Sequence, residues 1–372
     1  MRVHVVDPSA YTPPYDHALC RALGAAGADV TLYTSRFAHG SLAPAEHYER
    51  RELFYRAAGA VHGAGARRAV KLAEHVPAML RYRRAARAAD VVHFQWLPVQ
   101  ALDVHLLPDR RTLRGSRRPL VLTAHDVLPR EPARGQRAAQ QRLYERVDAL
   151  IVHTERGRAR LVTELGVQPG RVHVIPHGVL RPWEGQPPQA LPAELREVDG
   201  PVVLFFGLLR PYKGLDVLLG AWRELHGAEL WIVGMPRMDL GALHAAAPAG
   251  VRWLERFVSD GELLALMRRA SLVVLPYREI EQSGVAFTAI GAGVPLLLSD
   301  VGGFPELAAS GVARTFRTGD PASLHAALTE LLASPAELVA LAARASAAAA
   351  QDYSWARIAD QTLALYAQVL GR

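Results

Sequence analysis

The stretch FFGLLRPYKGLDVLL, residues 205–219, places Arg210 and Lys213 shortly after an apolar run that ends at Gly207. The chain has 43 Lys+Arg residues, of which only Lys71 and Lys213 are lysines. Arginine binds phosphate through a fork of N–H donors, whereas lysine acts as a point charge. Two such cations between a strand and a helix predict a phosphate or diphosphate site. The alternative is a pair of solvated surface cations.

A second stretch, LPYREIEQSGVAFTAIGAGVPLLLSD at residues 275–300, has a similar plan. An apolar run is followed by Glu281, Ser283, Gly284 and Val285, and then by a segment of helical spacing. Free amides at a helix N-terminus attract anions, and glycine allows a ligand to approach the backbone closely. Turns of this kind are common, but together the two stretches predict a diphosphate held between the amides near Gly284 and the two cations.

Histidines follow two apolar runs of the first half. His93 and His125 stand at or just after the ends of these runs, and Asp126 follows His125. A histidine at the end of a strand either contacts a substrate or forms structural hydrogen bonds. Asp16 and His17, at the start of the first predicted helix, are the alternative candidates for a base.

Apolar runs alternate with segments of helical spacing, which predicts an α/β fold with parallel sheets covered by helices. In the first half the predicted strands lie at 2–6, 29–34, 90–94, 119–124, 149–153 and 171–176; in the second half they lie at 201–207, 229–234, 250–255, 271–277 and 294–300. A proline-rich segment predicts a linker over 183–200, with domains at 1–182 and 201–353. An amphipathic terminal helix is expected over 354–372.

The composition limits the class of protein. The chain has 372 residues, 50% of them hydrophobic, which suits two domains. Cys20 is the single cysteine, so no internal disulfide is expected. We see no signal peptide and no apolar run of about 20 residues, which predicts a cytoplasmic protein. Neither a D-x-D motif nor a Cys/His cluster with metal spacing occurs, so no metal or other cofactor is expected.

The net charge of +7 is concentrated in arginine clusters at 67–90 and 110–118. Such clusters are either solvated helix faces or surfaces for an anionic membrane or a phosphorylated acceptor. Nucleic acid is not expected as a partner, because no basic motif interleaved with aromatic residues is present.

Taken together, the motifs resemble glycosyltransferase family 4, the retaining enzymes of the GT-B fold. In the second half the resemblance rests on residues 205–219, on RFVSDGELLALMRRASLVVLPY at 256–277, on EQSGVAFTAIGAGVP and on SDVGGFPEL at 299–307. In the first half it rests on VVHFQW, VLTAHDVLP and VIPHGV. The resemblance implies two facing Rossmann-like domains with a cleft between them, and a terminal helix that packs back on the first domain.

The resemblance also implies roles for particular residues. The donor would be bound by Gly207, Arg210, Lys213, Glu281, Ser283, Gly284, Val285 and Thr288, and His125 would contact the transferred sugar. The acceptor side would include Tyr11, Thr12, His93 and Asp126, within the loop at 7–16 and the segment at 36–66 as well as the strand ends.

The sequence departs from the family pattern at three places. Leu208 stands where the family has arginine directly after the strand glycine, so Arg210 takes that role. The usual pair of glutamates is replaced by Ile280, with Glu281 beside it, and by Thr288. The glycine-rich loop after the first strand is replaced by DPSAYTPPYD.

The predicted function is a metal-independent retaining transferase that moves a sugar from a nucleotide-diphosphate donor to an acceptor hydroxyl. Arg210, Lys213 and His125 are its predicted catalytic residues, and the acceptor is a small molecule, a glycan or a lipid-linked sugar. One rival is an inverting GT-B transferase or a nucleotide-sugar epimerase that uses His17 or His125 as base. Another is a nucleotide-sugar-binding protein without transfer activity.

Overall fold

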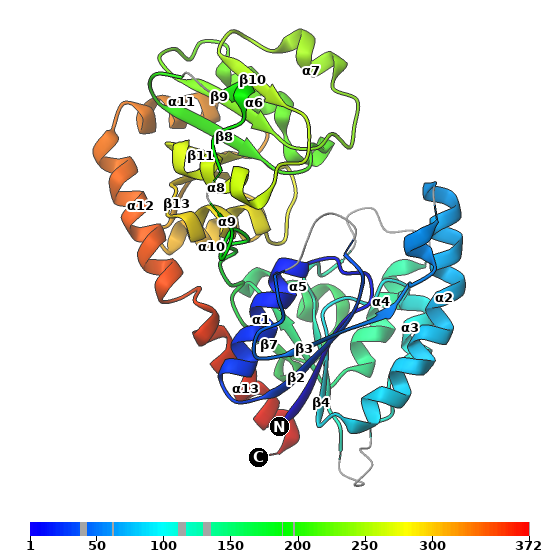
Figure 1. The fold of residues 1–372 in the computed structure, drawn as a ribbon. Coiled ribbons are helices and arrows are strands. Elements are labelled where there is room, and N and C mark those ends of the chain that lie inside the picture. The colour runs from blue at the N-terminus through cyan, green and yellow to red at the C-terminus, as the bar shows by residue number, and fades with distance from the viewer. Residues whose placement is uncertain are drawn as a thin grey trace. The chain divides into compact units, whose positions relative to one another are not determined.

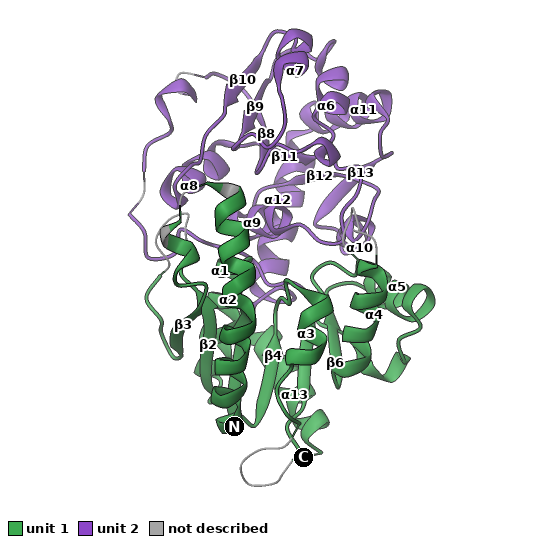
Figure 2. Cartoon of the chain, turned by 90° about the vertical axis from the view of Figure 1, so that its right-hand side faces the viewer, with its two compact units in different colours: residues 1–176, 355–372 green, residues 177–354 purple. Residues whose placement is uncertain are grey.

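The computed structural model describes residues 1–37, 43–61, 63–110, 117–128, 135–187, 189–195 and 198–371. The chain divides into two compact units (Figure 2). Unit 1 comprises Met1–Pro176 and Trp355–Arg372, and unit 2 comprises His177–Ser354. In each unit parallel strands alternate along the chain with helices (Figure 1). Both units therefore have a Rossmann-like α/β fold, which confirms the predicted fold class.

The sheet of unit 1 has the strand order β3-β2-β1-β4-β5-β6-β7. Its strands are β1 (Arg2–Asp7), β2 (Asp29–Ser35), β3 (Glu49–Phe54), β4 (Val91–Phe94), β5 (Leu120–Thr123), β6 (Ala149–Val152) and β7 (Val172–Val174). The direction of winding reverses between β1 and β4, so the crevice at the carboxyl ends of these two strands is the expected place for a ligand.

The helices of unit 1 are α1 (Pro13–Ala25), α2 (Ala64–Ala85), α3 (Gln100–Leu106), α4 (Gln136–Arg146), α5 (Glu155–Leu165) and α13 (Trp355–Leu370), with 3-10 turns at Ala58–Ala60, Ala86–Ala88 and Pro169–Arg171. Helix α13 packs on α1, although the two are far apart in sequence. Its Tyr366 hydroxyl lies 2.6 Å from Nδ1 of His93 on β4, so a buried hydrogen bond anchors the terminal helix.

The sheet of unit 2 has the order β10-β9-β8-β11-β12-β13, with its reversal between β8 and β11. Its strands are β8 (Val202–Phe206), β9 (Glu229–Val233), β10 (Val251–Leu254), β11 (Leu272–Leu275), β12 (Leu296–Ser299) and β13 (Ala313–Phe316). Its helices are α6 (Leu215–Trp222), α7 (Gly241–Ala246), α8 (Asp260–Arg269), α9 (Gly284–Ala292), α10 (Phe304–Ala309), α11 (Pro321–Leu332) and α12 (Pro335–Ala350), with 3-10 turns at Ala193–Leu195 and Pro211–Lys213.

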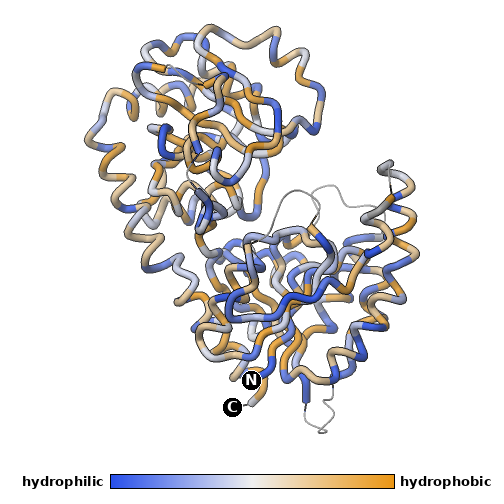
Figure 3. The backbone as a smooth tube through the Cα atoms, viewed as in Figure 1, coloured by the Kyte–Doolittle hydropathy of each residue, from blue (hydrophilic) through white to orange (hydrophobic). Residues whose placement is uncertain are grey.

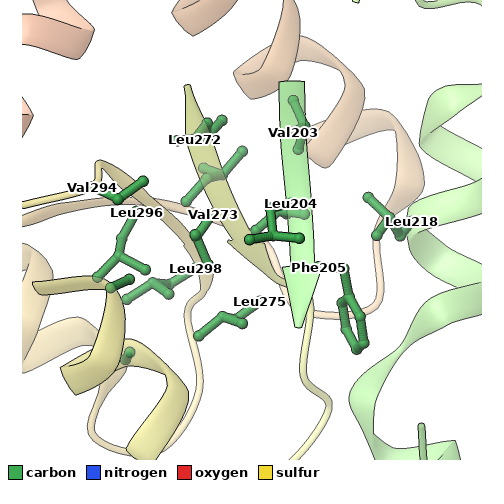
Figure 4. Close-up of a cluster of buried hydrophobic side chains, with 14 of the residues drawn as sticks. Val203, Leu204, Phe205, Leu218, Leu272, Val273, Leu275, Val294, Leu296 and Leu298 are labelled. Carbon is green, nitrogen blue, oxygen red and sulfur yellow. The ribbon is translucent and has the colours of Figure 1, made fainter. Parts of the chain in front are cut away.

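The central strands are apolar throughout because helices cover the sheet. Figure 4 shows Val203, Leu204 and Phe205 of β8 beside Leu272 and Val273 of β11, and all of these side chains are fully buried. In Figure 3 the interior strands of each unit are mainly hydrophobic. Fully burying one such side chain contributes about 1.5–3 kcal/mol, so each sheet is a stable base for the loops at its carboxyl edge.

The boundary between the units differs from the predicted one. Unit 2 begins at His177 rather than at 201, and the segment predicted as a linker is part of unit 2 and is anchored to its core at a few positions. Trp183 is 9% exposed and Leu195 is 1% exposed, so apolar side chains hold this segment against unit 2 despite its prolines. Residues 188, 196 and 197 of the predicted linker lie outside the described residues.

No single helix in the described ranges is long and apolar enough to cross a membrane; α11 and α12 pass that test only as a pair bent by 95°.

Candidate active site

The loops after β8, β9 and β11 are joined backbone to backbone at the reversal point of unit 2. The Gly207 amide donates to the Val233 carbonyl at 3.0 Å, and the Leu209 amide donates to the Met235 carbonyl at 3.0 Å. A Cβ at Gly214 would lie 2.0 Å from the Pro276 carbonyl oxygen, so only glycine permits this close contact. The loop that carries Arg210 and Lys213 is therefore held on both sides.

Lys213 is buried, with 6% of its surface exposed, at the end of the 3-10 turn Pro211–Lys213. Its Nζ lies 5.0 Å from the ring centre of Tyr277 and 5.8 Å from that of Phe205. A Cβ at Gly207 would lie only 2.7 Å from this Nζ and 3.2 Å from Cγ2 of Val285. Gly207, Lys213 and Val285, which the sequence assigned to one donor site, therefore meet at one point.

Gly207 is required here for two reasons. Its φ of +115° is a conformation that residues with a side chain rarely adopt. In addition, a methyl group would lie 2.7 Å from the Lys213 Nζ, so the ammonium would have to shift.

Arg210 takes a different position from Lys213. Its side chain is exposed, and within the described part of the chain no hydrogen bond or ion pair involves its guanidinium group. The same loop thus carries one buried cation and one exposed cation. Leu208, at the family's usual arginine position, is 39% exposed.

Helix α9 begins beside Lys213. The Ser283 hydroxyl accepts a hydrogen bond from the Ala286 amide at 3.3 Å and caps the helix. Because the first amides of a helix have no partner within it, those of Gly284 and Val285 are suited to an anion. A Cβ at Gly284 would lie 3.4 Å from Leu180 Cδ1, which is an ordinary van der Waals contact.

The two positions of the missing glutamates are occupied by groups with structural contacts. The Thr288 hydroxyl donates to the Gly284 carbonyl at 2.8 Å and is buried, so its proton is engaged within α9. Ile280 is 7% exposed, and Glu281 beside it is half-buried. The Glu281 carbonyl accepts from the Gly303 amide at 3.1 Å, which joins the loops after β11 and β12.

Replacing Lys213 by methionine tests the anion site, because methionine is unbranched, keeps most of the length of the side chain and removes its charge. We expect Lys213→Met to lower turnover on the order of 100- to 1000-fold, since a donor aimed at developing negative charge is lost. Lys71→Met is the matched control, because Lys71 is the other lysine and lies in unit 1. If a folded Lys213→Met protein has the turnover, donor affinity and circular dichroism of the wild type, the site is excluded.

In unit 1 the loop after β1 is organised by the buried carboxylate of Asp7. Its two oxygens accept hydrogen bonds from the backbone amides of Ser9 at 3.1 Å, Tyr11 at 2.6 Å and Thr12 at 3.3 Å. This arrangement fixes the DPSAYT segment at the reversal point, between the carboxyl end of β1 and the start of α1.

Asp16 in the first turn of α1 is 1% exposed and shares a hydrogen bond with Asp7. Burial raises the pKa of Asp16 well above its ordinary value, and the charge of Asp7 adds to this effect. Burial also raises the pKa of Asp7, but hydrogen bonds from Asp16 and from the loop amides oppose it. Asp16 therefore holds the shared proton and Asp7 is the carboxylate, so Asp16 is not a solvent-facing base.

The acid pair gives a prediction about pH and stability. A buried acid with a raised pKa keeps its proton in the folded state after the unfolded chain has lost it, so the free energy of unfolding falls as pH rises above about 4. Asp16→Asn mimics the neutral acid, and we expect it to remove this loss and raise the unfolding midpoint at pH 8. Asp7→Asn should instead destabilise by about 1–3 kcal/mol, because an amide group would face the loop amides. Urea unfolding at pH 5 and pH 8 measures both effects, and a destabilised Asp16→Asn protein at pH 8 would contradict the assignment of the proton.

His125 lies in a cluster of rings at the carboxyl ends of β1, β4 and β5. Its ring stacks on Trp96 at 4.9 Å between ring centres and 13° between planes, and it meets the edge of Tyr15 at 4.9 Å. The Trp96 indole N–H donates to the Thr12 hydroxyl at 3.1 Å. Tyr11, 62% exposed, lies 5.2 Å from Trp96. Three predicted residues, Tyr11, Thr12 and His125, are thus brought together around Trp96.

Both nitrogens of His125 contact polar groups from neighbouring strand ends. Nε2 lies 3.0 Å from Oε1 of Gln95, and Nδ1 lies 3.2 Å from Nε2 of His153. Burial lowers the pKa of His153 to about 4, so this histidine is neutral at pH 7. Asp126 is half-buried beside His125.

His93 is placed as a structural residue rather than at a surface. It is 1% exposed, and its Nε2 lies 2.7 Å from the Thr123 hydroxyl, while Nδ1 contacts Tyr366. Burial, together with the neighbouring His153, lowers its pKa to about 3. The geometry therefore favours structural hydrogen bonds for His93 over contact with a substrate.

His17, the other candidate base, does not share the contacts of His125. Its Nδ1 lies 2.9 Å from the Tyr48 hydroxyl, whereas Tyr15, two residues earlier on α1, is the residue that contacts His125. Successive side chains on a helix face different directions, which separates these two positions. Part of the segment predicted for the acceptor side, residues 38–42 and 62, lies outside the described residues.

The sequence interpretation missed Gln95, Trp96 and His153. Gln95 and Trp96 directly follow β4 in the run VVHFQW, and a polar and an aromatic residue just past a buried strand were the available signal. His153 follows β6, but the sequence does not show that its ring turns toward His125.

Among the described residues no group of three or more His, Cys, Asp or Glu side chains is arranged to hold a metal ion.

The two Rossmann-like units, each with a parallel sheet that has a reversal point, have the domain plan of the GT-B fold. Residues 15–179 match the family pattern described as Glycosyltransferase Family 4, and residues 200–334 match that described as Glycosyl transferases group 1. The chain belongs to family 4 of the glycosyltransferases, as the sequence motifs indicated.

Curated relatives include the D-inositol 3-phosphate glycosyltransferases of Mycolicibacterium paratuberculosis and Mycobacterium tuberculosis. The first is 29% identical over 277 residues, covering 68% of this chain and 62% of the relative. The second is 29% identical over 281 residues, covering 68% and 57%. The chain therefore spans about three fifths of the length of these relatives.

Solved structures share the fold at low sequence identity. Sucrose-phosphate synthase from Thermosynechococcus elongatus has a TM-score of 0.76 at 20% identity, with 100% of this chain and 99% of the other covered. HepE of Anabaena in complex with UDP-glucose has a TM-score of 0.73 at 18% identity, with 99% and 100% covered.

Proposed function

We propose that this chain is a retaining glycosyltransferase that moves a sugar from a nucleotide-diphosphate donor to an acceptor hydroxyl without a metal ion. The observation that carries the proposal is the buried ammonium of Lys213, packed against Gly207 beside the first turn of α9. Family membership supports the reaction class.

In this proposal the leaving diphosphate gains negative charge in the transition state. Lys213 and the amides of Gly284 and Val285 stabilise that charge, and the exposed Arg210 adds a second cation when the donor binds. Such fixed donors need no reorganisation during the reaction, which makes them effective in a site from which water is excluded.

The donor and the acceptor follow from the relatives only as candidates. HepE binds UDP-glucose, so a UDP-sugar is the first donor to test. The curated relatives are named for D-inositol 3-phosphate, so a phosphorylated cyclitol is the first acceptor to test. The exposed Tyr11 beside Trp96 supports a ring-shaped acceptor, because aromatic faces bind the apolar faces of sugars and cyclitols.

The retaining course is proposed because the leaving diphosphate can itself take the acceptor proton on the same face of the sugar. An inverting reaction instead needs a general base within hydrogen-bond reach of the acceptor hydroxyl. Asp16 is buried and protonated, and His17 contacts Tyr48, so neither supports that route.

The stereochemistry of the product tests this proposal. We first select the donor by thermal shift against UDP-, GDP-, ADP- and dTDP-sugars, since a donor at 100 times its Kd adds about 2.7 kcal/mol of stability. Proton NMR should then show an α linkage from an α-configured donor, with activity unaffected by a chelator and largely kept in His17→Ala.

A β linkage together with an inactive His17→Ala protein would establish the inverting route instead. Donor binding without hydrolysis or transfer, over a broad acceptor panel, would indicate a binding protein. An altered sugar without transfer would indicate an epimerase.

Contact with an anionic membrane is proposed for the exposed face of α2. Leu72 is 54% exposed and Leu80 is 41% exposed, and exposed arginines lie on the same helix and the turn that follows it: Arg67, Arg68, Arg81, Arg84 and Arg87. Apolar side chains flanked by arginine are typical of helices that lie in a membrane interface. The second cluster falls partly outside the described residues, at 111–116.

A double charge reversal tests the membrane surface. Each basic residue near an anionic surface contributes about 1 kcal/mol, so Arg81→Glu with Arg84→Glu should weaken binding to vesicles of anionic lipid by roughly 30-fold or more. Arg223→Glu, an exposed position in unit 2, is the matched control. Wild-type protein that fails to sediment with these vesicles at low salt would exclude the surface.

A further inference from the structure

The contacts behind His125 fix the direction of its hydrogen bonds. The first step is His153, whose Nδ1 lies 2.9 Å from the backbone carbonyl of Ile175. A carbonyl oxygen only accepts hydrogen bonds, so Nδ1 of His153 must carry a proton.

The second step is the charge of His153. Its ring is buried at the end of β6, with 7% of the residue exposed, and burial lowers its pKa to about 4. A neutral imidazole has one N–H and one lone pair. Since Nδ1 carries the proton, Nε2 of His153 presents its lone pair.

The third step concerns the hydrogen bond between His153 and His125. Its Nδ1 lies 3.2 Å from Nε2 of His153, so Nδ1 of His125 donates this hydrogen bond. The remaining nitrogen, Nε2, is the one that gains or loses a proton when His125 changes charge.

Gln95 can accommodate both charge states of that nitrogen. Its amide lies between His125 and His93, with its oxygen 3.0 Å from Nε2 of His125 and its nitrogen 3.2 Å from Nε2 of His93. The oxygen accepts from a protonated Nε2, and an amide turned by 180° donates to a neutral Nε2. His93 is held in turn by Thr123 and Tyr366, so the amide has a fixed neighbour.

We propose that His153 is a positioning residue that keeps the proton of His125 on Nδ1, so that Nε2 is the nitrogen available to a substrate. The proposal rests on the proposed function in one respect, that His125 contacts the transferred sugar. A hydroxyl of that sugar then replaces the Gln95 amide as the donor to the lone pair on Nε2 when His125 is neutral. In water a neutral histidine prefers the opposite arrangement, with the proton on Nε2, so the protein environment reverses the intrinsic preference.

The test measures the tautomer directly. Protein labelled with ¹⁵N in the histidine rings gives long-range ¹H–¹⁵N spectra that distinguish protonated from unprotonated ring nitrogens, and His125→Gln assigns the signals of His125. At pH 7.5 we expect the neutral wild-type ring to be protonated on Nδ1. His153→Asn keeps a donor for the Ile175 carbonyl but does not reach His125, so the proton should move to Nε2.

Thr123→Val is the matched control, because it removes a partner of His93 and leaves both contacts of His125 in place. The tautomer of His125 should be unchanged in this protein. A wild-type ring protonated on Nε2, or a His153→Asn protein with an unchanged tautomer, would overturn the proposal. If His153→Asn does not fold, the wild-type spectrum alone decides.

The activity of the same proteins separates this inference from the proposed function. If both hold, His153→Asn should lower kcat by up to about 100-fold with little change in KM for the donor, as misorientation of a reacting group does. If the tautomer moves as expected and the wild type transfers no sugar, the proposed function fails while the role of His153 stands.

Discussion

The candidate anion site of unit 2 depends on one close approach, because the Lys213 ammonium lies 2.7 Å from the place that a Cβ of residue 207 would take. A buried ammonium is costly unless its surroundings compensate for lost water, and the faces of Tyr277 and Phe205 provide part of that compensation. The contact exists because neighbouring loops are joined through their backbones. A Cβ at Gly234 would lie 1.9 Å from the Gly207 carbonyl oxygen, so the loops after β8 and β9 touch as closely as two chains can. The candidate site is therefore built mainly from backbone, to which the side chains of Lys213 and Arg210 are added.

The sequence predicted the central strands because each is covered on both faces and reads as an unbroken apolar run. It missed β3 and β13, two of the four edge strands, for the corresponding physical reason. The segment ERRELF of β3 is largely exposed, and ARTF of β13 has partly exposed polar residues. An edge strand with one solvent-exposed face lacks the unbroken apolar run that marks a buried strand. The predicted domain boundary at 182 also differs from the observed one. The prolines predicted a linker, whereas Trp183 and Leu195 pack into the core.

For the candidate site, the sequence predicted which residues share a strand end but not what their atoms do there. Gly207, Lys213 and Val285 could be grouped because ligands bind at the carboxyl ends of parallel strands. That Ser283 and Thr288 have hydrogen bonds within α9 could not be foreseen, since both hydroxyls had equally good roles toward a ligand. The partners of His125 depend on how rings from β4, β5 and β6 turn toward one another, which residue order does not encode.

The two units differ in the charges that lie at the reversal points of their sheets. Unit 2 gathers positive groups there: Lys213, Arg210 and the first amides of α9. Around its reversal point unit 1 holds three buried groups neutral at pH 7: His93 and His153, whose pKa is lowered to about 3 and about 4, and Asp16, which keeps its proton. The carboxylate of Asp7 beside them accepts hydrogen bonds from the loop amides. A surface built in this way presents hydrogen bonds and ring faces rather than charge. Neither buried histidine titrates in the neutral pH range, so the charge of this part of unit 1 does not depend on them there.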